Sequence, residues 1–126
     1  MPKKRVMIID PSLYSRSVLS NILVTHGYSI CYEAASGKDA VANYEKARPD
    51  LVLVEAKMKD RDGVAVIIEL VSKFPGCRTV LCAGSGQRSQ ICAAMSVGAV
   101  DFLAKPYSER GVVNTLRKIA VRERNS

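Results

Sequence analysis

Short, uninterrupted apolar runs recur along the chain and alternate with more polar stretches. Residues 6–9, 51–54, 79–83 and 100–104 form such runs, and residues 28–32 form a fifth, less apolar one. A run without polar interruption is typical of a strand that is covered on both faces, as in a parallel sheet between two layers of helices. The pattern therefore predicts five buried strands.

Helical periodicity fills the gaps between these runs. One apolar stripe lies between the first two strands and another follows the last strand, and three further helices are expected near residues 37–47, 63–74 and 87–97. The first stripe consists of Tyr14, Val18 and Ile22 with Leu19 and Leu23, and the second consists of Val112, Leu116, Ile119 and Ala120.

Residues that begin or end helices support the same division of the chain. Asp10 supplies an N-cap carboxylate, and Pro11 would then occupy the first helical position, where proline is tolerated. Gly27 and Gly98 are placed to end two helices, and Ser108 is placed to begin the last one. The final residues, 122–126, are expected to form a frayed tail.

Strands and helices that alternate through short loops require parallel pairing, right-handed crossovers and helices on both faces of the sheet. A chain of 126 residues has the length of one domain, and no linker, repeat or low-complexity stretch divides it. We therefore expect a single α/β domain over residues 1–126, with a doubly wound five-stranded parallel sheet and five helices.

Composition and charge narrow the choice of function. The chain is 48% apolar and 25% charged and has no apolar run long enough for a membrane span or a secretory signal, so a cytoplasmic protein is expected. Four cysteines without a C-x-x-C pair and a single histidine, His26, do not suit a zinc site. The net charge of +7 raises nucleic acid as a partner, but the basic residues are scattered and lack interleaved aromatics, so nucleic-acid binding ranks low.

Chemistry in an open parallel sheet is expected at the carboxyl ends of the strands. Asp10, Glu55, Ala83 and Lys105 leave their strands at this edge, so two carboxylates, a lysine and a glycine-containing loop should converge there. The loop lacks the lysine of a P-loop, and His26 lies at the far end of the first helix. A nucleotide site is therefore not expected, a hydrolase triad is excluded, and no enzymatic activity is expected.

Four segments resemble the receiver domains of bacterial response regulators, and the single-domain chemotaxis regulators in particular. They are residues 6–10 (VMIID), 49–55 (PDLVLVE), 62–63 (DG) and 98–106 (GAVDFLAKP). The resemblance covers nearly the whole chain and implies a flavodoxin-like, CheY-like fold with the strand order 2-1-3-4-5. It also implies a role in two-component signal transduction or a phosphorelay, with a protein partner such as a histidine kinase or a downstream effector.

The phosphorylation site departs from the pattern of the family that the chain resembles. Such receivers carry two adjacent acids after the first strand, a phosphoacceptor aspartate after the third, a Ser or Thr after the fourth and a Lys-Pro pair after the fifth. Asp10 and Lys105 with its following proline are kept, but Pro11 replaces the second acid, Glu55 the phosphoacceptor and Ala83 the hydroxyl residue.

Each departure has a chemical consequence. Pro11 removes an oxygen ligand for Mg²⁺, and Lys57 and Lys59 flank the site in sequence, so metal binding is expected to be lost or weak. Glu55 is one methylene longer than aspartate, which displaces the attacking carboxylate. Ala83 offers no hydroxyl to a phosphoryl oxygen. All of these changes predict loss of phosphorylation.

We therefore expect a pseudo-receiver that binds proteins without being phosphorylated. Glu55 has two interpretations: a fixed charge that pairs with Lys105 and imitates a phosphoaspartate, or an inert relic in a scaffold. In the family, the hydroxyl residue moves to the phosphoryl group and an aromatic on the fifth strand, here Phe102, turns inward. Because Ala83 cannot make the hydroxyl contact, a locked conformation is favoured over a working switch.

The resemblance places protein binding on the face formed by the fourth helix, the fifth strand and the fifth helix. A conventional phosphoaccepting regulator is the alternative function, followed by nucleic-acid binding, and the oligomeric state is left open. The peptide bond between Lys105 and Pro106 is expected to be cis, as in the family. The apolar candidates on the binding face are Ile91, Met95, Phe102, Tyr107 and Val113, of which Ile91 and Val113 are expected to belong to the core instead.

Overall fold

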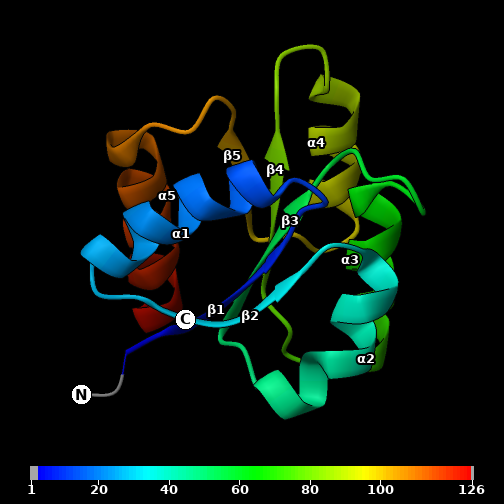
Figure 1. The fold of residues 1–126 in the computed structure, drawn as a ribbon, viewed down its shortest axis with the longest axis horizontal. Coiled ribbons are helices and arrows are strands. Elements are labelled where there is room, and N and C mark those ends of the chain that lie inside the picture. The colour runs from blue at the N-terminus through cyan, green and yellow to red at the C-terminus, as the bar shows by residue number, and fades with distance from the viewer. Residues whose placement is uncertain (1–2, 126) are drawn as a thin grey trace.

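The computed structural model describes residues 3–125 as a five-stranded parallel sheet between two layers of helices (Figure 1). The strand order is β2-β1-β3-β4-β5, so the expected doubly wound fold is confirmed. In chain order the elements are β1 (Arg5–Ile9), α1 (Leu13–Thr25), β2 (Ser29–Ala34), α2 (Gly37–Ala47), β3 (Leu51–Glu55), α3 (Gly63–Lys73), β4 (Thr79–Ala83), α4 (Arg88–Ser96), β5 (Asp101–Ala104) and α5 (Glu109–Arg124).

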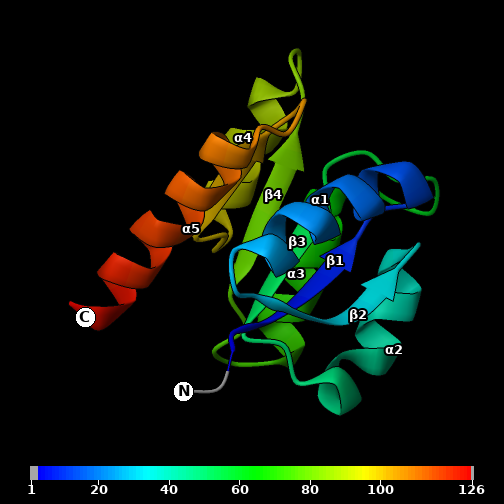
Figure 2. The same ribbon diagram turned by 60° about the vertical axis from the view of Figure 1, so that its left-hand side comes forward.

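The central strands are buried on both faces because successive side chains point to opposite sides of the sheet. On β1, Met7 and Ile9 join the core cluster under α2, α3 and α4, whereas Val6 and Ile8 join the cluster under α1 and α5. This arrangement explains the uninterrupted apolar runs. All strands point the same way, so their carboxyl ends meet at one edge of the sheet (Figure 2).

The start of α1 differs from the prediction. Ser12, not Asp10, is the N-cap, and the helix begins at Leu13, so Pro11 lies outside it. The carboxylate of Asp10 instead accepts a hydrogen bond from the Ser12 backbone N–H (2.8 Å) and turns towards the edge of the sheet. The predicted stripe also starts later than expected, because Tyr14 in the first turn of α1 is 79% exposed.

The expected frayed tail is helical up to Arg124. Arg122 donates to the carboxylate of Asp101 at 2.9 Å, and this contact ties the last turns of α5 to β5. The prediction of a tail from residue 122 was therefore wrong up to Asn125, which caps the helix, and Ser126 lies outside the described residues.

None of the helices formed by residues 3–125 has both the length and the apolar character that crossing a membrane would require.

Candidate functional site

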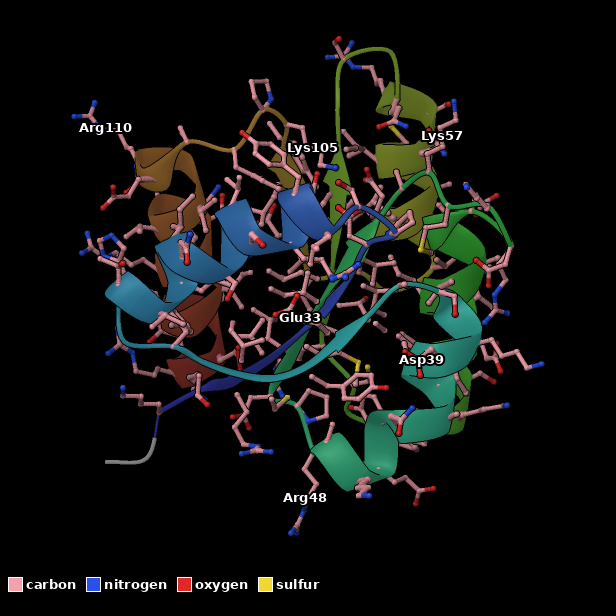
Figure 3. All side chains as sticks on the ribbon, viewed as in Figure 1. Glu33, Asp39, Arg48, Lys57, Lys105 and Arg110 are labelled. Carbon is pink, nitrogen blue, oxygen red and sulfur yellow. The ribbon has the colours of Figure 1, made fainter. Side chains whose placement is uncertain are left out.

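The side chains of Asp10, Glu55 and Lys105 meet at the carboxyl ends of β1, β3 and β5, as the sequence predicts. Lys105 Nζ lies 2.5 Å from Glu55 Oε1 and 3.3 Å from Asp10 Oδ2. The side chains of Lys105, Glu55 and Asp10 are 22%, 13% and 5% exposed, so water only partly screens the ion pairs. Figure 3 shows Lys105 at this edge of the sheet, close to the first turn of α1.

All four carboxylate oxygens of the cluster have hydrogen-bond donors. Asp10 Oδ1 accepts from the backbone N–H of Ser12 at 2.8 Å, and Glu55 Oε2 accepts from the backbone N–H of Ala56 at 2.8 Å. The two remaining oxygens accept from Lys105. Every carboxylate oxygen in the pocket therefore accepts a charge-assisted hydrogen bond.

Lys105 stays charged in this pocket. Its burial lowers its pKa, but the hydrogen bond and charge of Glu55, followed by the charge of Asp10, outweigh burial, and the pKa is raised above the ordinary value for lysine. One ammonium group thus holds two carboxylates that would otherwise repel each other.

Arg16 on α1 positions the backbone of Asp10, and the sequence offered no signal for this role. Its guanidinium donates to the carbonyl of Asp10 at 2.5 Å and to the Glu33 carboxylate at 3.1 Å. The backbone N–H of Asp10 in turn donates to the carbonyl of Ala34 at 3.0 Å. These contacts, distant in sequence, secure the end of β1 against β2.

Gly63 allows the loop after β3 to fold back against the strand end. Its N–H donates to the carbonyl of Ala56 at 2.8 Å, and a Cβ at this position would lie 2.3 Å from the carbonyl oxygen of Glu55. The Asp62-Gly63 pair noted in the sequence therefore has a structural role: Asp62 caps α3, and the glycine makes room for the backbone of Glu55.

Gly63→Ala is expected to lower the free energy of unfolding by about 1–3 kcal/mol, the usual cost of forcing additional atoms into a packed region. Urea denaturation followed by circular dichroism measures this change. Gly84→Ala is the matched control, because a Cβ at Gly84 would meet no atom closer than 3.9 Å. Equal stabilities of the two variants would contradict the steric role of Gly63.

Tyr107 closes the site on the side of α1 and α5. Its hydroxyl lies near the thiol of Cys82, its ring lies 5.5 Å from Lys105 Nζ, and it packs against the core cluster under these helices. Burial raises the pKa of both groups, that of Cys82 to about 12, so both stay protonated. Tyr107 is thus partly buried against this cluster. The peptide bond between Lys105 and Pro106 is cis, as predicted.

The two switch positions differ sharply in exposure. Ala83 is buried at the end of β4, whereas Phe102 is 39% exposed on β5. Of the other apolar candidates on this face, Met95 is exposed, Ile91 packs against the core cluster under α4 as expected, and Val113 is half-buried. Phe102 and Met95 are therefore the most exposed of these candidates.

Comparison with known proteins settles the family. The profile of the response regulator receiver domain matches residues 6–117. The chain belongs to this family. The receiver is 32% identical over 117 residues to the chemotaxis protein CheY of Thermotoga maritima, and the match covers 93% of this chain and 98% of that protein.

Solved structures share the fold of this receiver. A CheY-like receiver domain protein from Methanospirillum hungatei JF-1 has a TM-score of 0.86 at 21% identity, with 98% of this chain and 99% of that chain covered. A chain of the CheX–CheY–BeF3–Mg²⁺ complex from Borrelia burgdorferi has a TM-score of 0.86 at 23% identity, with 92% and 88% covered. These structures share the fold; the family match and the relatives identify this chain as a receiver domain of two-component signalling, and its chemistry must be argued from its own residues.

Proposed function

We propose that this receiver binds a signalling partner without being phosphorylated, and that Glu55 acts as a fixed counter-charge for Lys105. The observation that carries the proposal is the short contact between Lys105 Nζ and Glu55 Oε1, at 2.5 Å. Lys105, the lysine of the family pattern, is already neutralised by Glu55 and Asp10, and the second oxygen of Glu55 is engaged by a backbone N–H. Both oxygens of the carboxylate at position 55 thus already accept hydrogen bonds.

The residues around Lys105 do not fit a bound Mg²⁺ ion. Mg²⁺ requires near-octahedral oxygen ligands, usually including one or two carboxylates. Pro11 provides none, and the oxygens of Asp10 and Glu55 already accept hydrogen bonds. Within residues 3–125 no group of three or more His, Cys, Asp or Glu side chains is placed to hold a metal. We therefore assign no step to a metal ion.

The exposed ring of Phe102 supports a locked conformation. In switching receivers, movement of the hydroxyl residue accompanies the inward turn of this aromatic, and Ala83 has no hydroxyl to move. The charge pair of Glu55 and Lys105 is formed here while Phe102 stays exposed. In the proposed locked conformation, Glu55 pairs with Lys105 without drawing the aromatic inward, and the surface around Phe102 remains available to a partner.

The partner is proposed to be a protein that contacts α4, β5 and α5, such as a histidine kinase or a downstream effector. The similar CheY of Borrelia burgdorferi has been solved in a complex with CheX, which supports a protein partner for this receiver too. Phe102 and Met95 provide the exposed apolar surface that such a contact requires.

Incubation with acetyl phosphate and Mg²⁺ is expected to leave the intact mass of this receiver unchanged. Glu55 is one methylene longer than an aspartate acceptor, Pro11 stands in place of the second acid, and Ala83 offers no donor to the phosphoryl oxygens. Mass spectrometry of the intact protein measures the result. A stoichiometric gain of one phosphoryl group that hydroxylamine removes would overturn the proposal and establish a conventional phosphoaccepting regulator.

A further inference from the structure

The outer side of α5 carries a stripe of three arginines. Arg110, Arg117 and Arg124 are seven residues apart, and residues at this spacing lie on the same side of a helix. All three are exposed, opposite the side where Val112 and Leu116 enter the core. At 1.5 Å per residue the stripe is about 21 Å long. Figure 2 shows α5 along its length with its outer side uncovered, and Figure 3 shows Arg110 pointing away from the sheet.

Acidic side chains of the receiver do not neutralise this stripe. Arg110, Arg117 and Arg124 make no ion pair with any of residues 3–125. The acids of α5 are bound elsewhere: Glu109 to His26 at 2.6 Å, and Glu123 to Arg78 at 2.8 Å. A row of unpaired cations on the longest helix therefore produces a strongly positive surface.

An exposed apolar side chain interrupts the stripe and indicates the class of partner. Val121 is 44% exposed between Arg117 and Arg124, in a shallow groove that Lys118 and Arg122 also line. A phosphate backbone gains nothing from a valine, and single-stranded nucleic acid would require aromatic residues on which its bases stack. Alternating cations and an apolar residue fit a protein surface with carboxylates around an apolar side chain.

The neighbouring edge of the sheet does not offer a simple site for strand addition. The backbone N–H of Phe102 donates to the carboxylate of Asp101 at 2.8 Å, and the carbonyl of Val100 accepts from Arg122 at 3.3 Å. Two backbone groups along this edge, one in β5 and one just before it, are thus already occupied, which disfavours strand addition here. The exposed side chains of α5 offer the alternative mode of docking.

We infer that the partner of this receiver presents an acidic amphipathic helix that lies along α5. Its carboxylates, repeated every seven residues, face Arg110, Arg117 and Arg124, and an apolar residue between them covers Val121. This inference rests on the proposed function and adds the chemistry of the partner. It also places part of the interface beyond the apolar surface of Phe102 and Met95.

Fluorescence anisotropy with a designed peptide tests this inference. The probe is a labelled 21-residue helical peptide with Glu every seven residues and Leu between them, and the matched peptide carries Gln in place of Glu. We expect the Glu peptide to bind saturably, with an affinity that falls as salt is added. The Gln peptide should bind with at least about tenfold lower affinity.

Variants of the receiver locate the site. Arg110→Gln, Arg117→Gln and Arg124→Gln combined should weaken binding of the Glu peptide about tenfold while the circular dichroism spectrum stays unchanged. The control, Lys38→Gln, Lys46→Gln and Lys59→Gln combined, removes the same charge from exposed positions outside α5 and should bind within about twofold of the unmodified receiver.

Three results would overturn the inference: no binding of the Glu peptide, equal weakening by both sets of substitutions, or tighter binding to duplex DNA, duplex RNA or anionic vesicles than to the Glu peptide. The acetyl phosphate experiment does not involve α5. The proposed function can therefore stand if the peptide fails to bind, and it can fail while the peptide binds.

Discussion

Pro11→Asp, Glu55→Asp and Ala83→Thr, combined in one chain, are expected to give a receiver that takes one phosphoryl group from acetyl phosphate when Mg²⁺ is present. The first change supplies a second carboxylate beside Asp10, the second shortens the acceptor that now reaches Lys105, and the third supplies a hydroxyl donor. The carboxylate would attack phosphorus and acetate would leave. Intact mass before and after hydroxylamine treatment measures the gain.

Single substitutions are the controls for this gain of function. Glu55→Asp alone should stay unmodified, because groups that act as a unit contribute non-additively and each missing group costs about 10²-fold or more in rate. If Glu55→Asp alone is phosphorylated, Pro11 and Ala83 are not limiting. If the combined variant folds but stays unmodified, the three departures do not explain the inactive site.

Lys105→Met is expected to lower the free energy of unfolding at neutral pH by about 2–3 kcal/mol. Removal of one partner of a buried ion pair leaves an uncompensated charge, which costs about 3–5 kcal/mol when burial is complete. Here both Asp10 and Glu55 lose their shared cation, but Lys105 is partly exposed, so a smaller cost is expected. Methionine keeps most of the chain length, so the change in packing is small. Urea denaturation measures the difference.

The pH dependence separates charge from packing in this variant. Because folding raises the pKa of Lys105, its contribution to stability is complete below the unfolded value of about 10.4 and is lost as the pH rises through the folded value. The stability difference between the variant and the unmodified receiver should therefore shrink in strongly alkaline solution. A difference that stays constant at high pH would assign the effect to packing.

Lys118→Met is the matched control for Lys105→Met. Lys118 is 66% exposed and lies 4.0 Å from the carboxylate of Asp101, so its ion pair is screened by water. We expect a change within about 0.5 kcal/mol. If Lys118→Met lowers the free energy of unfolding as much as Lys105→Met does, removal of any lysine charge would explain the effect, and the ion pairs of Lys105 would not.

The sequence alone was sufficient to predict the sheet and the residues that meet at its edge. Residues 6–9 and 51–54 are apolar at every position because both faces of β1 and β3 are covered, and this signal is local. Once the strands are known to be parallel, Asp10, Glu55 and Lys105 must approach one another. An ion pair between Glu55 and Lys105 was therefore predictable from the sequence.

Contacts that depend on competition between partners were not predictable. Both Asp10 and Ser12 are good N-caps, and the sequence does not show that Lys105 and the Ser12 backbone would claim the carboxylate of Asp10. Fraying of residues 122–126 is predicted because chain ends are poorly ordered unless other contacts hold them. Its helix is held by the pair of Arg122 and Asp101, which are far apart in sequence.

The pair of Arg122 and Asp101 has a consequence for the behaviour of the whole molecule at high concentration. Within residues 3–125, β5 is an edge strand whose one sheet partner is β4, and an edge with free backbone groups is a template for cross-β polymerisation. Asp101 and Arg122 occupy such groups at Phe102 and Val100. Asp101 and Arg122 thus leave fewer free backbone groups at this edge with which another chain could pair.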